Sequence, residues 1–388
     1  MNDRERAFHI LRRVEREAAF AAPLLHSETG FVRTLVLGVL RWQLKLDHLI
    51  ATAAARRIEK IDPVVVLILR IGVYQLTSME VARYAAVSET VDLANKYAKR
   101  AGGFVNAVLR KASTTTVASP SLAIETSHPE WLLARWTRTY GAERTRAIAM
   151  ANQELSYPDV FVVNGLPPEE STPSLLVDDM YKLHGPTPEG YDALDEGSAV
   201  IATIAARAGS DVLDLAAAPG GKTLVMRGRG ARVVSNDVSL ARLMPLVGRG
   251  ARIVVSDGRR PPFAKPFQSV LLDAPCSATG TIRKNPELKW RLREADLSTF
   301  ATLQRELLAS ALTLARETVV YSTCSLEPEE NDAVIDDALA ANGDFTRADI
   351  ADYAPPQIAP WIDNGVLRLT PESGADGFTA FVLVRAHS

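Results

Sequence analysis

Apolar residues in the first part of the chain recur every three or four positions, which is the spacing of one face of an α-helix. The pattern is clearest in "FVRTLVLGVLRWQLKLDHLI" (31–50) and "AVSETVDLANKYAKRAGGFVNAVLRK" (86–111), and proline is almost absent before residue 112. Two adjacent glycines, Gly102 and Gly103, separate one helical run from the next. We therefore predict a compact all-helical domain over residues 1–115.

The pattern changes after this region. Residues 116–128 are small and polar and include a proline, which is typical of a linker between domains. Residues 129–195 begin with a helical pattern, continue into the short apolar run "DVFVVN", and end in a loop rich in Pro and Glu. We predict a linker over 116–128 and a connecting α/β subdomain over 129–195.

The region 196–388 alternates short apolar runs with helical segments. Apolar runs of this kind are typical of strands buried on both faces of a parallel sheet. The pattern predicts an α/β, Rossmann-like domain with helices on both faces of the sheet. The predicted strands are "DVLDLA", "RVVSND", "RIVVSD", "SVLLDA", "TVVYST" and "FTAFVLV".

Charge is distributed unevenly although the net charge is only −2. Residues 1–115 hold 18 Lys+Arg against 11 Asp+Glu, whereas the rest holds 26 against 35. A basic helical domain suggests an anionic partner, although solvated helix faces give the same count. The start "MNDRERAF" has no apolar signal segment, and the apolar run 64–69 is too short to span a bilayer, so we expect a cytoplasmic protein without membrane contact.

The two cysteines of the chain lie in similar surroundings. Cys276 occurs in "LLDAPCSATGTIRKN" and Cys324 in "YSTCSLEPEEND"; each follows an apolar run and precedes a serine. Without an export signal a disulfide is not expected, which leaves inert burial or chemical use. No His or further Cys lies at ligand spacing from either thiol, so we expect no metal.

Polar side chains stand at or just beyond the ends of the predicted strands. In open α/β sheets such side chains converge on one ligand-binding crevice. The loop "DLAAAPGGKT" (214–223) lacks the first glycine of a phosphate-binding loop, because that position is Ala216, and no dinucleotide fingerprint is present. The strand-end residues are Asp214, Asp237, Asp257, Asp273 and Cys324.

An adenosine ligand with a short charged tail fits this arrangement better than a nucleoside triphosphate does. Asp237 can accept hydrogen bonds from ribose hydroxyls, and Asp257 can accept one from an adenine amino group. The amides around Gly220 to Lys222 can bind a carboxylate. S-adenosylmethionine (SAM) has all of these parts.

Two thiols beside a methyl donor suggest methylation of pyrimidine carbon 5. That carbon becomes nucleophilic only after a thiolate adds to carbon 6, and a second thiol can serve the later elimination. The helix expected after Cys324, with Pro328 near its start, would supply a dipole that favours a thiolate. Asp273 could recognise cytosine through ring nitrogen 3 and the exocyclic amine, or could simply cap a strand end. The residues alone do not assign the roles of Cys276 and Cys324.

The motifs resemble those of the RNA cytosine-5 methyltransferases, and particularly the subgroup that acts on bacterial small-subunit ribosomal RNA. "LDLAAAPGGKT", "SDG", "DAPCSATGTIRKNPELKW" and "YSTCSLEPEEN" are similar to that family's motifs, and residues 1–111 are similar to a NusB-like RNA-binding domain. The resemblance implies that Cys324 is the nucleophile and Cys276 the release residue, with Asp273 also catalytic. It places SAM at Ala216, Ala217, Ala218, Pro219, Gly220, Gly221, Lys222, Asp237, Asp257 and Asp273.

The sequence also departs from the family pattern. The segment 225–258 is shorter than usual, and "YDALDEGSAVIATIA" lacks the expected glutamine-aspartate pair. Both departures concern SAM affinity or RNA docking more than the catalytic residues.

The expected partner is RNA, specifically 16S ribosomal RNA, bound by a monomer. A flipped base on a loop or accessible strand suits the chemistry. Trp290 could stack on a nucleotide or pack in a core. Two alternatives remain: a transfer RNA methylase, or a non-catalytic RNA-binding factor with a relic second domain. The candidate phosphate contacts are Arg56, Arg57, Lys96, Lys99, Arg100, Arg110, Lys111, Arg283 and Lys284.

Overall fold

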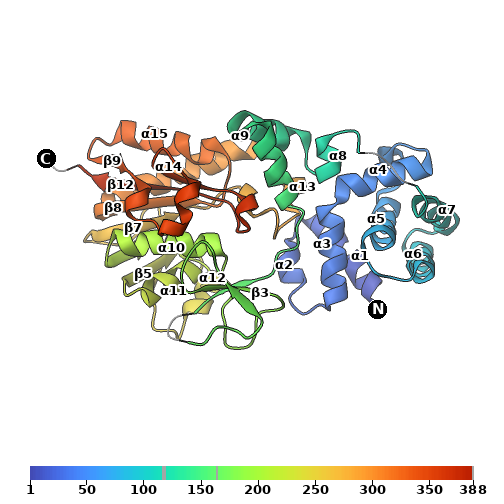
Figure 1. Ribbon diagram of the computed structural model, residues 1–388, viewed down its shortest axis with the longest axis horizontal. Helices are drawn as coiled ribbons and strands as arrows, with labels where there is room; N and C mark the ends of the chain where they lie inside the picture. Colours follow the sequence, from blue (N-terminus) through green and yellow to red (C-terminus); the bar gives the residue numbers. More distant parts are fainter. Residues whose placement is uncertain (116–118, 163–164, 387–388) are drawn as a thin grey trace. The chain divides into compact units, whose positions relative to one another are not determined.

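The computed structural model describes residues 1–115, 119–162 and 165–386 (Figure 1). The chain divides into two compact units. The first contains Met1–Glu154 together with Ile282–Leu292, and the second contains Leu155–Thr281 and Arg293–Ser388. The domain boundaries expected at residues 115, 128 and 195 remain a prediction, because they refer to parts of the chain that fold independently.

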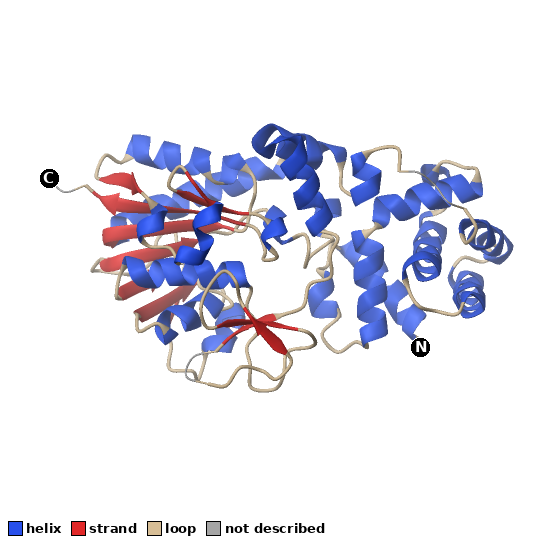
Figure 2. Ribbon diagram, in the orientation of Figure 1, coloured by secondary structure: helices blue, strands red, loops and turns tan. Residues whose placement is uncertain are grey.

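The first unit is helical in its described residues, as Figure 2 shows, and this confirms the expectation of an all-α N-terminal region. Side chains cap several of its helices: Asn2, Thr29 and Asp62 each accept a hydrogen bond from a first-turn amide. The helices are α1 (Asp3–Glu17), α2 (Ala21–Leu24), α3 (Gly30–Arg41), α4 (Gln43–Ala54), η1 (Ile58–Lys60), α5 (Pro63–Ser78), α6 (Arg83–Tyr97), α7 (Gly102–Ala112), α8 (Leu122–Thr126), α9 (Glu130–Ala151) and α13 (Leu288–Arg291).

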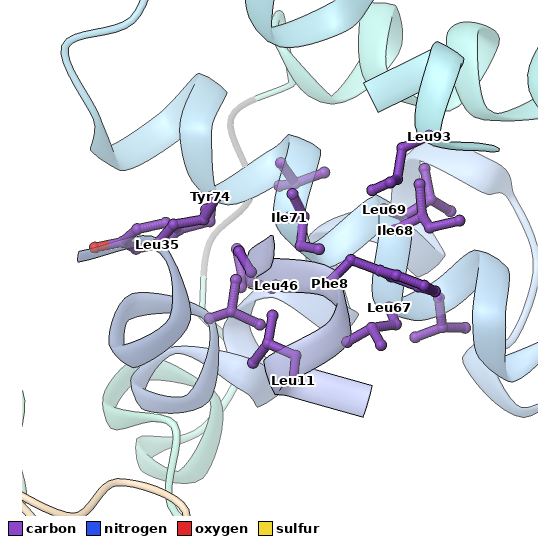
Figure 3. Close-up of a cluster of buried hydrophobic side chains, with 14 of the residues drawn as sticks. Phe8, Leu11, Leu35, Leu46, Leu67, Ile68, Leu69, Ile71, Tyr74 and Leu93 are labelled. Atoms are coloured by element: carbon purple, nitrogen blue, oxygen red, sulfur yellow. The ribbon is translucent and has the colours of Figure 1, made fainter. Parts of the chain in front are cut away.

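Helix α5 is the centre of this unit. Its residues 65–69 are all buried, so it is apolar around its whole circumference, as expected of a helix enclosed by others. Figure 3 shows Ile68, Ile71 and Tyr74 of α5 among Phe8 and Leu11 of α1 and residues of neighbouring helices. Burial of these side chains is the main stabilising contribution to the helical unit.

The second unit contains a small sheet and a large one. The small antiparallel sheet has the order β1-β3-β2, from β1 (Asp159–Phe161), β2 (Ser171–Pro173) and β3 (Met180–Leu183). The large sheet has the order β10-β11-β12-β8-β7-β4-β5-β6, with β9 paired to β12. Its strands are β4 (Asp211–Asp214), β5 (Arg232–Asp237), β6 (Arg252–Val255), β7 (Phe267–Asp273), β8 (Ala315–Thr323), β9 (Phe345–Ala348), β10 (Ile362–Asp363), β11 (Val366–Leu369) and β12 (Phe378–Arg385).

The large sheet is mixed rather than wholly parallel. Strands β6, β5, β4, β7 and β8 run parallel, whereas β12 pairs antiparallel with β8. The expectation of a parallel strand at "FTAFVLV" was therefore wrong. Strand β12 also pairs antiparallel with β11, which precedes it through a short connection that contains only η7 (Pro371–Ser373), as a connection without a crossover helix requires.

Helices cover both faces of the large sheet, which confirms the Rossmann-like arrangement (Figure 1). One apolar core lies between the sheet and α10 (Glu196–Ala208) and α11 (Gly221–Gly228). The other lies under α14 (Asp296–Leu314) and α15 (Asp332–Ala341). Between β5 and β6, the shortened segment forms only α12 (Leu240–Leu243) and η2 (Met244–Leu246). Besides η7, the other 3₁₀ turns of this unit are η3 (Thr279–Thr281), η4 (Pro328–Glu330), η5 (Ile350–Asp352) and η6 (Pro356–Trp361).

Candidate active site

The two thiols lie next to each other. Strands β7 and β8 are parallel neighbours, with Asp273 opposite Ser322, so the loops that follow them emerge at the same edge of the sheet. Cys276 Sγ and Cys324 Sγ are 3.4 Å apart, and both cysteines are free. The structure therefore confirms the expected juxtaposition of the two thiols.

Cys276 is held in its protonated form. Its hydrogen bond to Cys324 raises the pKa of the Cys276 thiol well above the ordinary value, with burial and the charge of Cys324 adding to the effect. A thiol with a raised pKa donates a hydrogen bond more readily than it attacks carbon. The geometry thus favours the protonated form of Cys276.

Lys222 and Asp273 form an ion pair beside the thiols. Lys222 Nζ is 2.7 Å from Asp273 Oδ2, while Ser322 Oγ donates to Asp273 Oδ1 at 2.8 Å. Burial lowers the pKa of Lys222, but Asp273 outweighs burial and leaves that pKa raised. Cys324 also interacts favourably with the Lys222 charge, so the lysine is the cation that can stabilise a thiolate there.

The expected helix dipole behind Cys324 is largely missing. Pro328 begins η4, which has only three residues, and α15 starts at Asp332. So short a turn has little dipole, because the macrodipole requires aligned peptide groups. The Lys222 ammonium supplies the positive charge that sequence reasoning had assigned to a helix terminus.

The glycine-rich loop after β4 borders a cavity of about 360 Å³. Gly220 adopts φ 112°, and a side chain there would meet Leu246 at 2.4 Å, so both backbone conformation and space require glycine. Gly221 begins α11 beside this loop. The predicted site residues that line the cavity are Ala216, Ala217, Ala218, Pro219, Gly221, Lys222 and Asp273.

Asp237 is close to this loop but is already engaged by the backbone. Its Oδ2 accepts a hydrogen bond from the Ala218 amide at 3.1 Å, and its Oδ1 accepts one from the Ser239 amide at 3.0 Å. The carboxylate thus fixes the loop after β4 against the end of β5. It does not belong to the lining of the 360 Å³ cavity.

Asp257 does not line the cavity beside the glycine-rich loop. Arg259 binds both of its carboxylate oxygens, and that guanidinium lowers the pKa of Asp257 to about 2. Asp257 lines a separate cavity of about 540 Å³ with Arg259, Arg260 and Glu306. The structure consequently brings Asp273 and the glycine-rich loop together but does not bring Asp257 into the same cavity.

Two features of the cavity were missed by sequence reasoning. Asp214, noted only as a strand end, is buried, and burial raises the pKa of this carboxyl to about 7, although Thr223 donates a hydrogen bond to it. Arg249 of the shortened segment pairs with Asp192 at 2.6 Å, and both line the cavity. Asp214 was detectable from its place at the end of the first strand; Arg249 had no sequence signal.

The basic residues proposed for RNA contact fall into two groups. Arg283 is buried in the first unit, where its carbonyl accepts from Arg41 at 2.9 Å, and Lys284 is half-buried. Trp290 packs against the helical core and donates to the Leu40 carbonyl at 2.7 Å, as a core aromatic does. The other seven candidates are exposed on the helical unit: Arg56, Arg57, Lys96, Lys99, Arg100, Arg110 and Lys111.

The described residues contain no cluster of three or more His, Cys, Asp or Glu side chains arranged to hold a metal ion. Within the same residues, every helix is too short or too polar to cross a membrane.

Two sequence-family profiles match the chain. Residues 201–383 match the profile described as 16S rRNA methyltransferase RsmB/F, and residues 1–114 match the NusB family. The chain is 31% identical to ribosomal RNA small subunit methyltransferase B of Pseudomonas syringae pv. tomato, covering 92% of this chain and 89% of that relative. It is 28% identical to the probable enzyme of that name from Bacillus subtilis, covering 97% of both.

The fold also matches a solved structure. The crystal structure of PH0851 superposes with a TM-score of 0.78 at 23% identity and covers 99% of both chains. At this identity the likeness concerns the fold alone.

Proposed function

Because the chain belongs to the RsmB/F family of SAM-dependent RNA methyltransferases, we propose that it methylates carbon 5 of a cytosine in small-subunit ribosomal RNA. The observation that carries this proposal is the pair of free thiols 3.4 Å apart beside the Lys222–Asp273 ion pair. Most methyl transfers need no nucleophile from the enzyme, because the substrate atom attacks the methyl group directly. Two adjacent thiols suit a reaction that must both form and break a bond between enzyme and base.

Cys324 is the nucleophile in this proposal. Its thiolate adds to carbon 6, and the electron pair of the 5,6 double bond moves to carbon 5, which then bonds to the methyl group. Lys222 favours the thiolate by its charge, and the Cys276 thiol stabilises it by hydrogen bonding. SAM, when bound, supplies the electrophilic methyl group and leaves as the neutral thioether.

Cys276 serves the release step. The hydrogen bond and charge of Cys324 both contribute to raising the pKa of Cys276, and both end once the Cys324 sulfur is bonded to carbon 6. Cys276 then gives its own proton to water more easily, and the resulting thiolate can accept the proton from carbon 5. The electron pair of that C–H bond restores the ring double bond, and Cys324 departs as a thiolate.

Asp273 recognises the base in this scheme. A carboxylate oxygen that accepts a hydrogen bond from the exocyclic amine suits cytosine, because uracil presents a carbonyl oxygen in place of the amine. Lys222 fixes one oxygen of Asp273, and Ser322 fixes the other. This fixed orientation reduces the reorganisation needed when charge develops on the ring.

The cavity beside the glycine-rich loop suits the cofactor. Its volume of about 360 Å³ lies within the usual range for small-molecule sites, roughly 300–1,000 Å³. Residues 216–222 would hold the methionine part in this cavity. Asp237 and Asp257, which lie outside its lining, would hold the ribose and, once the bonds of Asp257 to Arg259 rearrange, the adenine. The exposed basic residues of the domain predicted over 1–115 would contact RNA phosphates.

Replacing each cysteine separately tests the roles of the thiols. With SAM and ribosomal RNA from cells lacking the protein, Cys276→Ala is expected to accumulate a covalent protein–RNA adduct, because attack proceeds and release does not. Cys324→Ala is expected to form none. Denaturing gel electrophoresis with labelled RNA measures the adduct.

The doubly substituted protein, Cys276→Ala with Cys324→Ala, is the control and should behave as Cys324→Ala does. Adduct in Cys324→Ala but not in Cys276→Ala would show that the roles are reversed. Absence of methyl transfer by the wild-type chain to ribosomal RNA, with transfer to transfer RNA instead, would change the substrate assignment.

A further inference from the structure

Glu330 is a fully buried carboxylate surrounded by hydrogen-bond donors. Its Oε2 accepts from the Ser277 amide at 2.8 Å and from Gln304 Nε2 at 2.9 Å. Its Oε1 accepts from Ser325 Oγ at 2.7 Å and from Ser277 Oγ. Burial of a carboxylate costs free energy unless donors of this kind replace water, so these four bonds keep the group in place.

The donors come from the two loops that carry the thiols. Ser277 directly follows Cys276 after β7, and Ser325 directly follows Cys324 after β8. The two serine hydroxyls are 3.1 Å apart, only slightly closer than the two sulfurs at 3.4 Å. The serine after each cysteine is therefore the residue through which one carboxylate joins both loops.

The backbone of Glu330 is fixed as well. Tyr321 Oη donates to the Glu330 carbonyl at 2.6 Å, and the Glu330 amide donates to the Glu327 carbonyl at 3.1 Å. The neighbouring Asn331 accepts from Thr323 Oγ1 at 2.7 Å and donates to the Ser325 carbonyl at 3.0 Å. The carboxylate is consequently presented by a rigid turn rather than by a mobile side chain.

We propose that Glu330 is a positioning residue that fixes the distance between the two thiols by binding the serine that follows each of them. The proposal rests on the proposed function for its catalytic meaning, although the geometry it assigns can be tested without RNA. Glu330 touches neither the base nor the cofactor in this scheme. It acts through Ser277 and Ser325.

The charge of Glu330 has a second effect. It contributes to raising the pKa of Cys276, after the larger contributions of Cys324 and burial. Removing the charge while keeping the side-chain shape should lower that pKa. This gives a measurement that loss of structure alone would not reproduce.

Thiol crosslinking tests the positioning directly. Dibromobimane becomes fluorescent when both of its arms have reacted with thiols, whereas monobromobimane reports each thiol separately. When each crosslinking rate is divided by the single-arm labelling rate of the same protein, Glu330→Gln should crosslink at least about tenfold more slowly than wild type, since a shift of about 1 Å can change a rate about 100-fold. Glu317→Gln, which removes an exposed carboxylate on β8, is the matched control and should crosslink as wild type does.

Ser277→Ala and Ser325→Ala provide a second test should Glu330→Gln fail to fold. Each removes one donor and keeps the carboxylate, so each should slow crosslinking while circular dichroism and SAM binding by calorimetry stay as in wild type. Unchanged crosslinking in folded Glu330→Gln, or in both serine variants, would overturn the proposal.

The methylation reaction gives the second readout. In Glu330→Gln, kcat should fall about tenfold or more with the Kd for SAM unchanged. The pH midpoint for decay of the protein–RNA adduct should move lower, whereas Ser277→Ala, which retains the charge, should leave that midpoint in place. An unchanged pH midpoint for adduct decay in Glu330→Gln would contradict the effect of the Glu330 charge on the pKa of Cys276. Normal wild-type crosslinking without cytosine methylation would refute the proposed function and leave the positioning role standing.

Discussion

At the scale of single residues, the site depends on groups whose chemical state is set by a neighbour. The Cys276 thiol stays protonated because Cys324 is 3.4 Å away, and Lys222 stays charged despite burial because Asp273 is 2.7 Å away. Cys276, Cys324, Lys222 and Asp273 were each predicted as site residues from the sequence. Their pairing depends on distances that no sequence pattern states.

Asp214 gives a prediction at this scale. Burial raises the pKa of its carboxyl from 3.8 to about 7, so the folded protein keeps a proton that the unfolded chain loses above pH 4. This contribution to the free energy of unfolding is complete below the Asp214 pKa of the unfolded chain, and it is lost as the pH rises to about 7. Asp214→Asn cannot ionise, and its amide oxygen can still accept the hydrogen bond from Thr223. Its free energy of unfolding relative to that of wild type should therefore increase by about 2–3 kcal/mol from pH 5 to pH 8.

Urea titrations of both proteins at the two pH values measure this difference. Thr223→Val is a useful comparison because it removes the hydrogen bond to Asp214 and leaves the carboxyl titratable. A stability difference that is the same at pH 5 and pH 8 would contradict the raised pKa.

At the scale of elements, the loops after β7 and β8 are held together by close backbone contacts as well as by Glu330. Gly280 lies in η3, and its amide donates to the Cys324 carbonyl at 2.9 Å. The Gly280 carbonyl in turn accepts from the Gly377 amide at 2.8 Å. The loop after β7, the loop after β8 and the residue before β12 thus meet at Gly280.

Gly280→Ala should disrupt this contact. The added methyl carbon would lie 2.3 Å from the Gly377 carbonyl oxygen and 2.9 Å from that of Cys324, and backbone atoms cannot move aside as side-chain ends do. We expect a loss of about 1–3 kcal/mol in the free energy of unfolding, together with slower thiol crosslinking. Thermal and denaturant unfolding followed by circular dichroism measure the first effect.

Gly103→Ala is the matched control, because among the described residues no atom lies within 4 Å of the place that the added methyl carbon would take in α7. It should leave stability unchanged or raise it by up to about 1 kcal/mol, since alanine favours helix. Equal stability of Gly280→Ala and wild type would show that the loop adapts and that the close approach is not required.

At the scale of the whole molecule, the chain does not pass only once from one compact unit to the other. Residues 282–292, which directly follow the Cys276 loop and η3, belong to the helical unit. There Lys289 donates to the Arg41 carbonyl at 2.8 Å, and Trp290 donates to that of Leu40. The helical unit is therefore completed by a segment far away in the sequence.

Lys289 allows a test of this packing. Burial, with a smaller contribution from Arg41, lowers the pKa of Lys289 well below 10.5, so the folded state favours the neutral amine while the unfolded chain is protonated. This stability is present at high pH and is lost as pH falls below the unfolded pKa. As the pH falls from 9.5 to 7, wild type should lose stability and Lys289→Met should not. The difference in their free energies of unfolding should therefore shift in favour of Lys289→Met by at most about 1.4 kcal/mol per pH unit.

Guanidinium titrations across this pH range measure the trend. Lys45→Met, which changes a lysine over the ring of Trp42 in the same unit, is the control and should show no comparable pH dependence. A constant difference between Lys289→Met and wild type would mean that the Lys289 amine reaches solvent in the folded protein.

The sequence alone determined what is encoded locally. The spacing of apolar residues predicted the helices of the first region, because a period of 3.6 residues marks one face of a helix. Continuous apolar runs predicted the strands β4 to β8, because a strand buried on both faces is apolar at successive positions. The glycine-rich loop, both cysteines and Asp273 were identified by residue type and by position at strand ends. Their proximity followed from one general property of parallel sheets.

Tertiary structure decided what depends on partners distant in the chain. It made β12 antiparallel, engaged Asp257 with Arg259 and placed residues 282–292 in the helical unit. It also turned Glu330, one of several acidic residues in "LEPEEN", into a buried link between two serines. Hydrogen bonds and burial act over a few ångströms in space, and a sequence records only separation along the chain.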